Sequence, residues 1–287
     1  MFLEMIKVEH SIFALPYAML GMMWGSVWKS GSAWPGIWPF FWIVVAMVSC
    51  RSAAMAFNRI ADREIDSKNP RTVMRALPAG LLSLRQANLF FVASVAIFIF
   101  AAAMLNPLAL ALSPVALLVT LGYSLSKRFT FLCHLILGLS LGIAPAAALI
   151  GVTGTLHIAI LPIVAAVMFW TAGFDIIYAL QDDEFDRENR LHSIPQRFGR
   201  RRALLTSRVF HVLSILCLLT AGAFFGSGQI YVWGVAFAAA MLIYEHLLVK
   251  EDDLSKVNVA FFTLNGMISI GVFAFALMDV IWGQGGR

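Results

Sequence analysis

The residues of this chain that are best suited to chemistry are two groups of acidic side chains, each at the end of an apolar stretch. Asn58, Asp62 and Asp66 form the first acidic group, and Asp182 and Asp186 form the second. Residues four apart lie on the same face of a helix, so each group predicts a row of side-chain oxygens. Such oxygens are the ligands that Mg²⁺ prefers, and Mg²⁺ commonly binds substrate phosphates as well. The two groups therefore predict a site for Mg²⁺ and a diphosphate.

Basic and aromatic residues accompany the acidic groups. Arg71 and Arg75 follow the first group, and Tyr123 and Lys127 form an i, i+4 pair at a predicted helix end. Arginine and lysine are the usual partners of phosphate oxygens. We expect these side chains to bind the phosphate oxygens that Mg²⁺ leaves uncovered. The alternative is that the acidic groups are solvated helix ends, paired with neighbouring arginines.

Two ionisable residues lie within apolar stretches, seven positions before the acidic groups. Arg51 precedes Asn58, and Asp175 precedes Asp182 with Tyr178 between them. An arginine in the middle of a membrane helix costs about 2.5 to 3.5 kcal/mol to insert, so it needs a partner. Either an ion pair with an acidic-group carboxylate or a direct contact to substrate would satisfy Arg51. Asp175 could hold or abstract a proton, or face developing positive charge.

The composition is that of a protein that crosses a membrane several times. Hydrophobic residues make up 60% of the chain, charged residues 13%, and the mean hydropathy is +0.83. A helix needs roughly 17 to 25 apolar residues to cross a bilayer. Such runs lie near 11–28, 37–57, 87–105, 107–122, 131–151, 156–181, 203–224, 229–249 and 259–282. The count of nine depends on a helix break at Asn106–Pro107, where proline favours a boundary.

The basic residues predict the orientation of the chain in the membrane. Seventeen of the 21 Lys and Arg fall in alternate connecting segments, including Lys7, Lys127, Arg128 and the run Arg200–Arg202. Positive residues gather in cytoplasmic loops, so we expect the N-terminus and both acidic groups to face the cytoplasm of a plasma or inner membrane. We interpret Arg128 and Arg200–Arg202 as topology charges only. Scattered among apolar runs, these charges do not indicate nucleic-acid binding.

The histidines and cysteines show no metal-binding pattern. Six histidines lack any HExxH-like spacing, so we interpret them as packing or interfacial residues. The three cysteines lie within apolar runs and have no paired spacing, which excludes a zinc site or a disulfide framework. Gly-rich phosphate loops are absent too.

The two acidic groups could be copies of one another. A shift of 120 residues aligns Asp62 with Asp182, Glu64 with Glu184, Asp66 with Asp186 and Asn69 with Asn189. Four predicted helices separate the groups, so a repeat would be parallel, unlike the inverted repeats of many transporters. We interpret residues 1–287 as one transmembrane domain, with repeat copies at 1–130 and 131–287. Four identities in a short window can also arise by chance.

These motifs resemble those of the UbiA-type intramembrane prenyltransferases, the family that includes 4-hydroxybenzoate polyprenyltransferase. The family's NxxxDxxxD motif matches Asn58, Asp62 and Asp66, and its DxxxD motif with a preceding Asp-x-x-Tyr matches Asp175, Tyr178, Asp182 and Asp186. Tyr-x-x-x-Lys matches Tyr123 and Lys127, and Arg-x-Leu-Pro-x-Gly matches Arg75 to Gly80. The resemblance extends over nearly the whole chain.

The resemblance implies an all-α bundle around a central cavity, beneath cytoplasmic cap loops. Asp62, Asp66, Asp182 and Asp186 would hold Mg²⁺ on the diphosphate of an allylic polyprenyl donor. Lys127, Arg71 and Arg51 would neutralise the remaining charge as the C–O bond breaks. The allylic cation would then attack an electron-rich aromatic acid, with Asp175 and Tyr178 guarding the cation or steering the acceptor, and the membrane would exclude water.

The acceptor and two other functional classes stay open. The stretches 173–182 and 191–195 resemble the quinone-pathway branch of the family. They do not separate prenylation of 4-hydroxybenzoate, for ubiquinone or menaquinone, from prenylation of another aromatic acid in the futalosine route to menaquinone. A cation-coupled transporter would predict acidic residues near mid-membrane and an inverted repeat, and neither is seen. A lipid alcohol phosphotransferase would use similar aspartates but fits the Asn-led motif less well.

Overall fold

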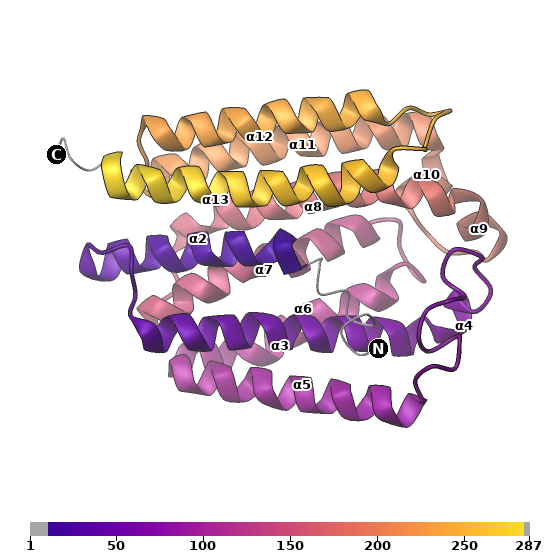
Figure 1. Ribbon diagram of the computed structural model, residues 1–287, viewed down its shortest axis with the longest axis horizontal. Helices are drawn as coiled ribbons and strands as arrows, with labels where there is room; N and C mark the ends of the chain where they lie inside the picture. Colours follow the sequence, from indigo (N-terminus) through magenta and orange to yellow (C-terminus); the bar gives the residue numbers. More distant parts are fainter. Residues whose placement is uncertain (1–10, 284–287) are drawn as a thin grey trace.

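Nine long helices run side by side in the computed structural model, which describes residues 11–283 (Figure 1). They are α2 (Ser11–Ser30), α3 (Ile37–Ala61), α5 (Leu84–Leu105), α6 (Pro107–Ser126), α7 (Cys133–Thr153), α8 (Leu161–Ala179), α11 (Arg200–Phe224), α12 (Gln229–Leu248) and α13 (Asn265–Trp282). No strand occurs among the described residues. The predicted all-α membrane bundle is confirmed: eight helical segments in this range are long and apolar enough to cross a bilayer, and α2 completes the set of nine long helices. Lys7 lies outside the described residues.

The expected break between two of these helices occurs at Asn106. This residue is extended (φ −170°, ψ 166°), and its Oδ1 accepts a hydrogen bond from the amide of Ala109 at 2.9 Å. Pro107 then occupies the first turn of α6, where its missing N–H leaves no helical hydrogen bond unmade. The Asn106 Nδ2 donates to the carbonyl oxygens of Ile150 and Gly151 in α7. Asn106 therefore both separates α5 from α6 and fastens the break to α7.

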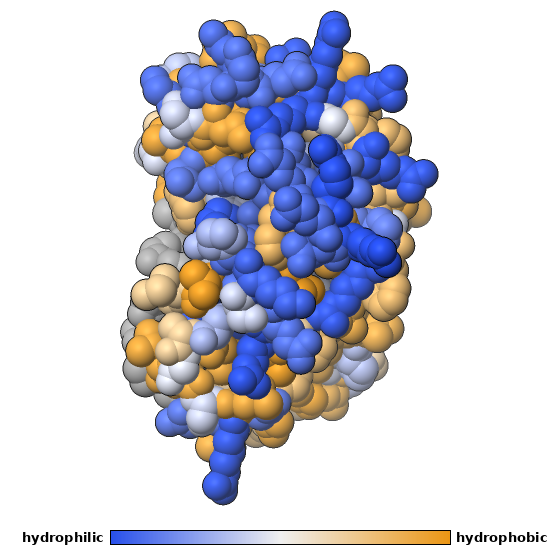
Figure 2. Space-filling model, turned by 90° about the vertical axis from the view of Figure 1, so that its right-hand side faces the viewer, coloured by the Kyte–Doolittle hydropathy of each residue, from blue (hydrophilic) through white to orange (hydrophobic). Residues whose placement is uncertain are grey.

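The short elements that follow α3 and α8 lie together at one end of the bundle. They are α4 (Arg63–Asp66), the 3-10 turn η3 (Leu180–Asp182), α9 (Asp183–Glu188) and α10 (Ile194–Phe198). Hydrophilic residues gather on this end of the molecule (Figure 2). We call it the polar end. Both acidic groups lie there.

Neither acidic group forms the uninterrupted helical row that its spacing predicts. α3 ends at Ala61, and Asp62 (φ −94°, ψ 8°) separates it from α4, which carries Asp66. Asp182 (φ −112°, ψ 6°) is the last residue of η3 and directly precedes α9, which carries Asp186. The four-residue spacing does not predict these breaks. The contacts that accompany them come from other parts of the chain. The two aspartates of each group therefore point to different partners.

Glycines bring the helices that carry the site into close contact. A Cβ on Gly138 of α7 would lie only 2.2 Å from the backbone oxygen of Met168 in α8. One on Gly21 of α2 would overlap the backbone of Pro145 in α7. Small residues at such crossings allow van der Waals packing between helices that have no hydrophobic driving force in lipid. α7 is thereby held tightly between α2 and α8.

The helices α5 and α6 form an outer wall of the bundle. The buried residues of α6 are all hydroxylated, namely Ser113, Thr120, Ser124 and Ser126, whereas Val115 and Leu118 are exposed. The Ser113 hydroxyl donates to the Leu110 oxygen, the backbone acceptor that Pro114 leaves without a helical donor. Apolar residues on α5 and α6 thus face outward, as expected for contact with lipid.

Candidate active site

Two adjoining cavities extend inward from the polar end. The polar cavity, of about 230 Å³, lies between the two acidic groups. The apolar chamber, of about 460 Å³, lies deeper and is bounded by α3, α5, α6, α7 and α8. Their shared wall consists of Asn58, Arg59, Arg75, Tyr123, Leu137, Asp175 and Tyr178. A charged compartment therefore adjoins a hydrophobic one.

All twelve residues predicted from the sequence line these cavities. Asp62, Asp66, Arg71, Lys127, Asp182 and Asp186 line the polar cavity alone. Asn58, Arg75, Tyr123, Asp175 and Tyr178 line both. Arg51 lines the apolar chamber alone. The fold thus gathers residues from three separate stretches of the chain, 51–75, 123–127 and 175–186, while their chemical roles stay predictions.

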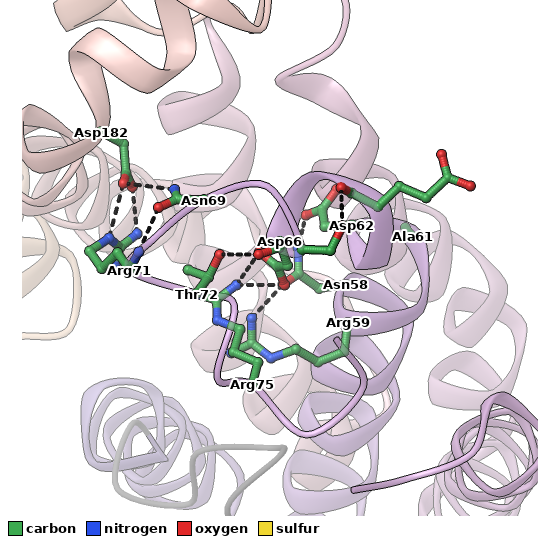
Figure 3. Close-up of polar contacts among 12 residues, drawn as sticks. Asn58, Arg59, Ala61, Asp62, Asp66, Asn69, Arg71, Thr72, Arg75 and Asp182 are labelled. Carbon is green, nitrogen blue, oxygen red and sulfur yellow. Dashed lines mark hydrogen bonds and ion pairs between the residues drawn. The ribbon is translucent and has the colours of Figure 1, made fainter. Parts of the chain in front are cut away.

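The first acidic group is held by two arginines. Arg75 donates from Nη1 to both carboxylate oxygens of Asp66, at 2.7 and 2.8 Å (Figure 3). Asp62 accepts from Asn58 Nδ2 at 2.8 Å and from Arg128 Nη2 at 3.1 Å. Burial raises the pKa of Asp62 above its ordinary value, and the hydrogen bond from Arg128 only partly offsets that effect.

The second acidic group is held by residues from several elements. Asp182 accepts from Arg71 Nε at 3.0 Å and Nη2 at 2.5 Å. Lys127, just beyond α6, places its Nζ 2.7 Å from Asp186 Oδ1, and the Ser193 hydroxyl donates to Asp186 Oδ2 at 3.0 Å. The Asp186 side chain is 0% exposed. Burial opposes the charge on Lys127, but the ion pair with Asp186 outweighs it and raises the pKa of the lysine.

The loop after α4 bridges the two groups. Asn69 and Arg71 extend from this loop to Asp182, and Asn69 Nδ2 donates to Asp182 Oδ1 at 3.1 Å (Figure 3). Arg71 also donates from Nη1 to the Tyr178 hydroxyl at 2.8 Å and lies over the ring, 5.0 Å from its centroid. Although burial opposes the charge, the pairing with Asp182 raises the pKa of Arg71. One loop that follows the first group therefore closes over the second.

Two residues for which the sequence predicted no role in the site line the polar cavity. Arg128, interpreted as a topology charge, contacts both Asp62 and the Ala61 carbonyl oxygen. His134, interpreted as a packing residue, places Nδ1 2.6 Å from Asp175 Oδ2. Both interpretations are corrected. No spacing in the sequence identifies His134, because it meets Asp175 only where α7 packs against α8.

The carboxylates fit Mg²⁺ by their chemistry. Their oxygens surround the polar cavity, and each of the four aspartates is paired with one cation, Arg128, Arg75, Arg71 or Lys127. Within residues 11–283, no three His, Cys, Asp or Glu side chains come close enough to enclose a metal ion. Mg²⁺ usually takes one or two carboxylates and completes its shell with water and substrate phosphates, so an open arrangement of this kind suits it.

Comparisons with known proteins agree with this geometry. The model of the UbiA prenyltransferase family matches residues 18–267. A 4-hydroxybenzoate octaprenyltransferase of Vibrio parahaemolyticus is 31% identical over 93% of this chain and 94% of its own length. The apo structure of a UbiA homolog from Aeropyrum pernix K1 is 32% identical, with a TM-score of 0.80 over 96% of this chain and 98% of that one.

A more distant structure shares the fold. It is a UbiA homolog from Archaeoglobus fulgidus bound to DMAPP and Mg²⁺, 20% identical to this chain, with a TM-score of 0.73 over 98% of this chain and 99% of that one. Motifs, fold and cavities thus lead to one assignment, and the transporter alternative finds no support. This chain belongs to the UbiA prenyltransferase family and is a multi-pass membrane enzyme that transfers prenyl groups.

Proposed function

We propose that this enzyme transfers a polyprenyl group from an allylic polyprenyl diphosphate to an aromatic acid such as 4-hydroxybenzoate, with Mg²⁺ as its cofactor, in quinone biosynthesis. The observation that carries the proposal is the junction of the two cavities. A charged compartment suited to a diphosphate shares a wall with an apolar chamber suited to an isoprenoid tail. That wall carries Asp175 and Tyr178, so the reacting carbon of the donor would lie beside them.

The polar cavity is the diphosphate side of the site. Asp62, Asp66, Asp182 and Asp186 would hold Mg²⁺, which supplies positive charge to the diphosphate oxygens. Arg71 and Lys127 now pair with these carboxylates, at 2.5 and 2.7 Å. On donor binding they can turn to the phosphate oxygens and stabilise the negative charge that the leaving diphosphate gains.

The apolar chamber is the side of the prenyl tail and the acceptor ring. Its walls exclude the water that would otherwise capture an allylic cation. Arg51 lies about 10 Å along α3 from Asn58, given a rise of about 1.5 Å per residue, and lines this chamber. An arginine there suits the carboxylate of an aromatic acid, because guanidinium binds carboxylate in a bidentate way. The ring of such an acid would then face the junction.

Asp175 and Tyr178 are the proposed catalytic residues at the junction. The ring of Tyr178 and the carboxylate of Asp175 both favour a nearby cation, the first through its π face and the second through its charge. Arg71 binds the Tyr178 hydroxyl at 2.8 Å and so fixes the ring beside the diphosphate. Tyr123 lines the same wall and would contact the donor near its diphosphate.

The relatives support the choice of donor, acceptor and metal. The name of the Vibrio parahaemolyticus protein gives 4-hydroxybenzoate as the acceptor and an octaprenyl group as the cargo. The Archaeoglobus fulgidus structure holds a prenyl diphosphate together with Mg²⁺. The acceptor for this chain is 4-hydroxybenzoate in our proposal, and an aromatic acid of the futalosine route is the alternative to be tested beside it.

The orientation of the enzyme is part of the proposal. We place the polar end in the cytoplasm of a plasma or inner membrane, because most of the Lys and Arg lie in segments at that end. The chain would act as one domain. A parallel repeat of residues 1–130 and 131–287 accounts for the similar helix breaks at Asp62 and Asp182.

Membranes that contain the enzyme provide the test. They are incubated with a labelled polyprenyl diphosphate and one aromatic acid at a time. The acids tested are 4-hydroxybenzoate and a panel of others. We expect prenylated product, its loss when a chelator is added, and its return with excess Mg²⁺. A panel in which no acid becomes prenylated would refute the acceptor class, and product formation that resists the chelator would refute the metal.

A further inference from the structure

His134 is a buried histidine beside the proposed catalytic carboxylate. It lies in the first turn of α7, and its side chain is 3% exposed, whereas the Asp175 side chain in α8 is 22% exposed. Their separation of 2.6 Å, between His134 Nδ1 and Asp175 Oδ2, is that of a strong hydrogen bond. His134 lines the polar cavity, and Asp175 lines both cavities. The pair therefore lies at the junction of the diphosphate side and the acceptor side.

Each ring nitrogen of His134 contacts a polar group. The N–H of Ile194, in α10, donates to His134 Nε2 at 3.4 Å. The Asp175 carboxylate accepts the hydrogen bond from Nδ1, and the Ile194 amide contacts the other ring nitrogen. The contacts with Asp175 and with the Ile194 amide together fix the orientation of the His134 ring. Asp175 is thus held by Oδ2 while its side chain stays accessible to the cavities.

The segment that orients His134 also contacts the second acidic group. The Ser193 hydroxyl donates to Asp186 Oδ2 at 3.0 Å, one residue before the amide that binds His134. The N–H of His192 donates to the Lys127 carbonyl oxygen at 2.7 Å. An unbroken run of contacts therefore leads from Asp186 through residues 192–194 to His134 and Asp175.

We propose that His134 is a positioning residue for prenyl transfer: it holds Asp175 by one oxygen so that the other accepts the proton that the aromatic ring loses. The inference rests on the proposed function, because it requires an aromatic acceptor. The contacts through Ser193 and Ile194 place this proton acceptor in a fixed relation to the diphosphate side. An Asp175 without His134 could rotate about its side-chain bonds away from the acceptor.

The step balances as an aromatic substitution. The bond between the allylic carbon and the diphosphate oxygen breaks, and its electron pair leaves with the diphosphate. A ring carbon of the acceptor forms the new C–C bond to the allylic carbon. The C–H bond at that ring carbon then breaks, its electron pair restores the aromatic ring, and the proton goes to the Asp175 carboxylate. No oxidant or reductant is needed.

Two substitutions of His134 separate positioning from packing. H134L fills the space without a hydrogen-bond donor, whereas H134N keeps an amide N–H near the place of Nδ1. General acid–base catalysis contributes roughly 10² to 10⁴ in rate, and loss of positioning should remove part of it. We expect H134L to lower kcat about 10- to 100-fold with the donor KM unchanged, and H134N to recover most of the loss.

An isotope effect tests the proton step itself. The aromatic acid that the wild type uses is deuterated on the ring, and kcat is compared with that of the unlabelled acid. Slower removal of the ring proton should give H134L a larger isotope effect than the wild type. The matched control is H211L, because His211 is also buried and lies against Gly173 of α8 but pairs with His246, away from the site.

The outcomes distinguish this inference from the proposed function. If the wild type prenylates no aromatic acid, the proposed function fails and the role of His134 fails with it. If the wild type is active and H134L matches it in kcat, only the inference fails. Equal losses in H134L and H134N, with an isotope effect no larger than in the wild type or in H211L, would also overturn it.

Discussion

The two acidic groups share their four-residue spacing but differ in the origin of their partners and in their extremes of burial. Asp62 in the first group has a side chain that is 22% exposed, whereas that of Asp186 in the second is 0% exposed. Asp66 pairs with Arg75, only nine residues along the chain. The partners of the second group come from the loop after α4, from the end of α6 and from the start of α10.

Two motifs with the same spacing therefore make different structural contacts. The second group connects elements that are far apart in sequence, and through Ser193 it reaches the pair His134 and Asp175. The first group is held mainly by its own loop and by Arg128. We therefore expect both groups to be needed for activity, but only the second to be needed for the order of the polar end.

Substitution of a motif aspartate should lower transfer activity more than any other change considered. Asp62→Ala, Asp182→Ala and Asp186→Ala should each lower transfer by at least about 10²- to 10³-fold, since each removes charge aimed at the metal and diphosphate. Only the second-group variants should also lower the melting temperature, because their cations lose a buried partner. Assays and thermal unfolding in detergent measure both effects.

A matched control for the Asp186 variant lies in the same short helix, α9. Glu184→Gln removes a carboxylate whose side chain is 83% exposed, so activity and melting temperature should stay close to the wild type. Equal destabilisation by Asp62→Ala and Asp186→Ala would show that the two groups do not differ as proposed.

An intermediate effect is expected from the neighbouring cations Lys127 and Arg128. Lys127→Ala should raise the donor KM about 10-fold without changing the choice of acceptor, because it removes a charge next to the fully buried Asp186. Arg128→Ala should raise the donor KM less than Lys127→Ala does, since the side chain of Asp62 is partly hydrated. Steady-state kinetics with two aromatic acids tests this order. A changed acceptor profile in Lys127→Ala would instead place Lys127 on the acceptor side.

The smallest effect is expected at Asn69. Asn69→Ala removes one hydrogen bond to Asp182 but leaves the two from Arg71 in place. A net loss of about 1 kcal/mol corresponds to roughly a five-fold rise in the donor KM. Varying the donor concentration in the kinetic assay measures this rise in KM. A loss as large as that of Asp182→Ala would mean that the loop depends on Asn69 rather than on Arg71.

The class of the protein, the approximate ranges of its helices and the chemical types at the site were predictable from the amino-acid sequence. Apolar runs long enough for a bilayer can do little other than form helices there, because lipid offers the backbone no hydrogen bonds. The break at Asn106–Pro107 was predictable, since the properties of proline are local. The twelve predicted residues were found by spacing and resemblance, and all of them line the two cavities.

The contacts between these residues depend on the packing of the whole chain. It interrupts both acidic rows, at Asp62 and Asp182, and directs the two halves of each row to different partners. It brings Arg71 to Asp182 and His134 to Asp175, pairs that lie 111 and 41 positions apart in the chain. Spacing reports which residues share a helix face, whereas contacts between helices depend on how closely α7 packs against its neighbours. That packing follows from the shapes of many side chains at once, which no single motif records.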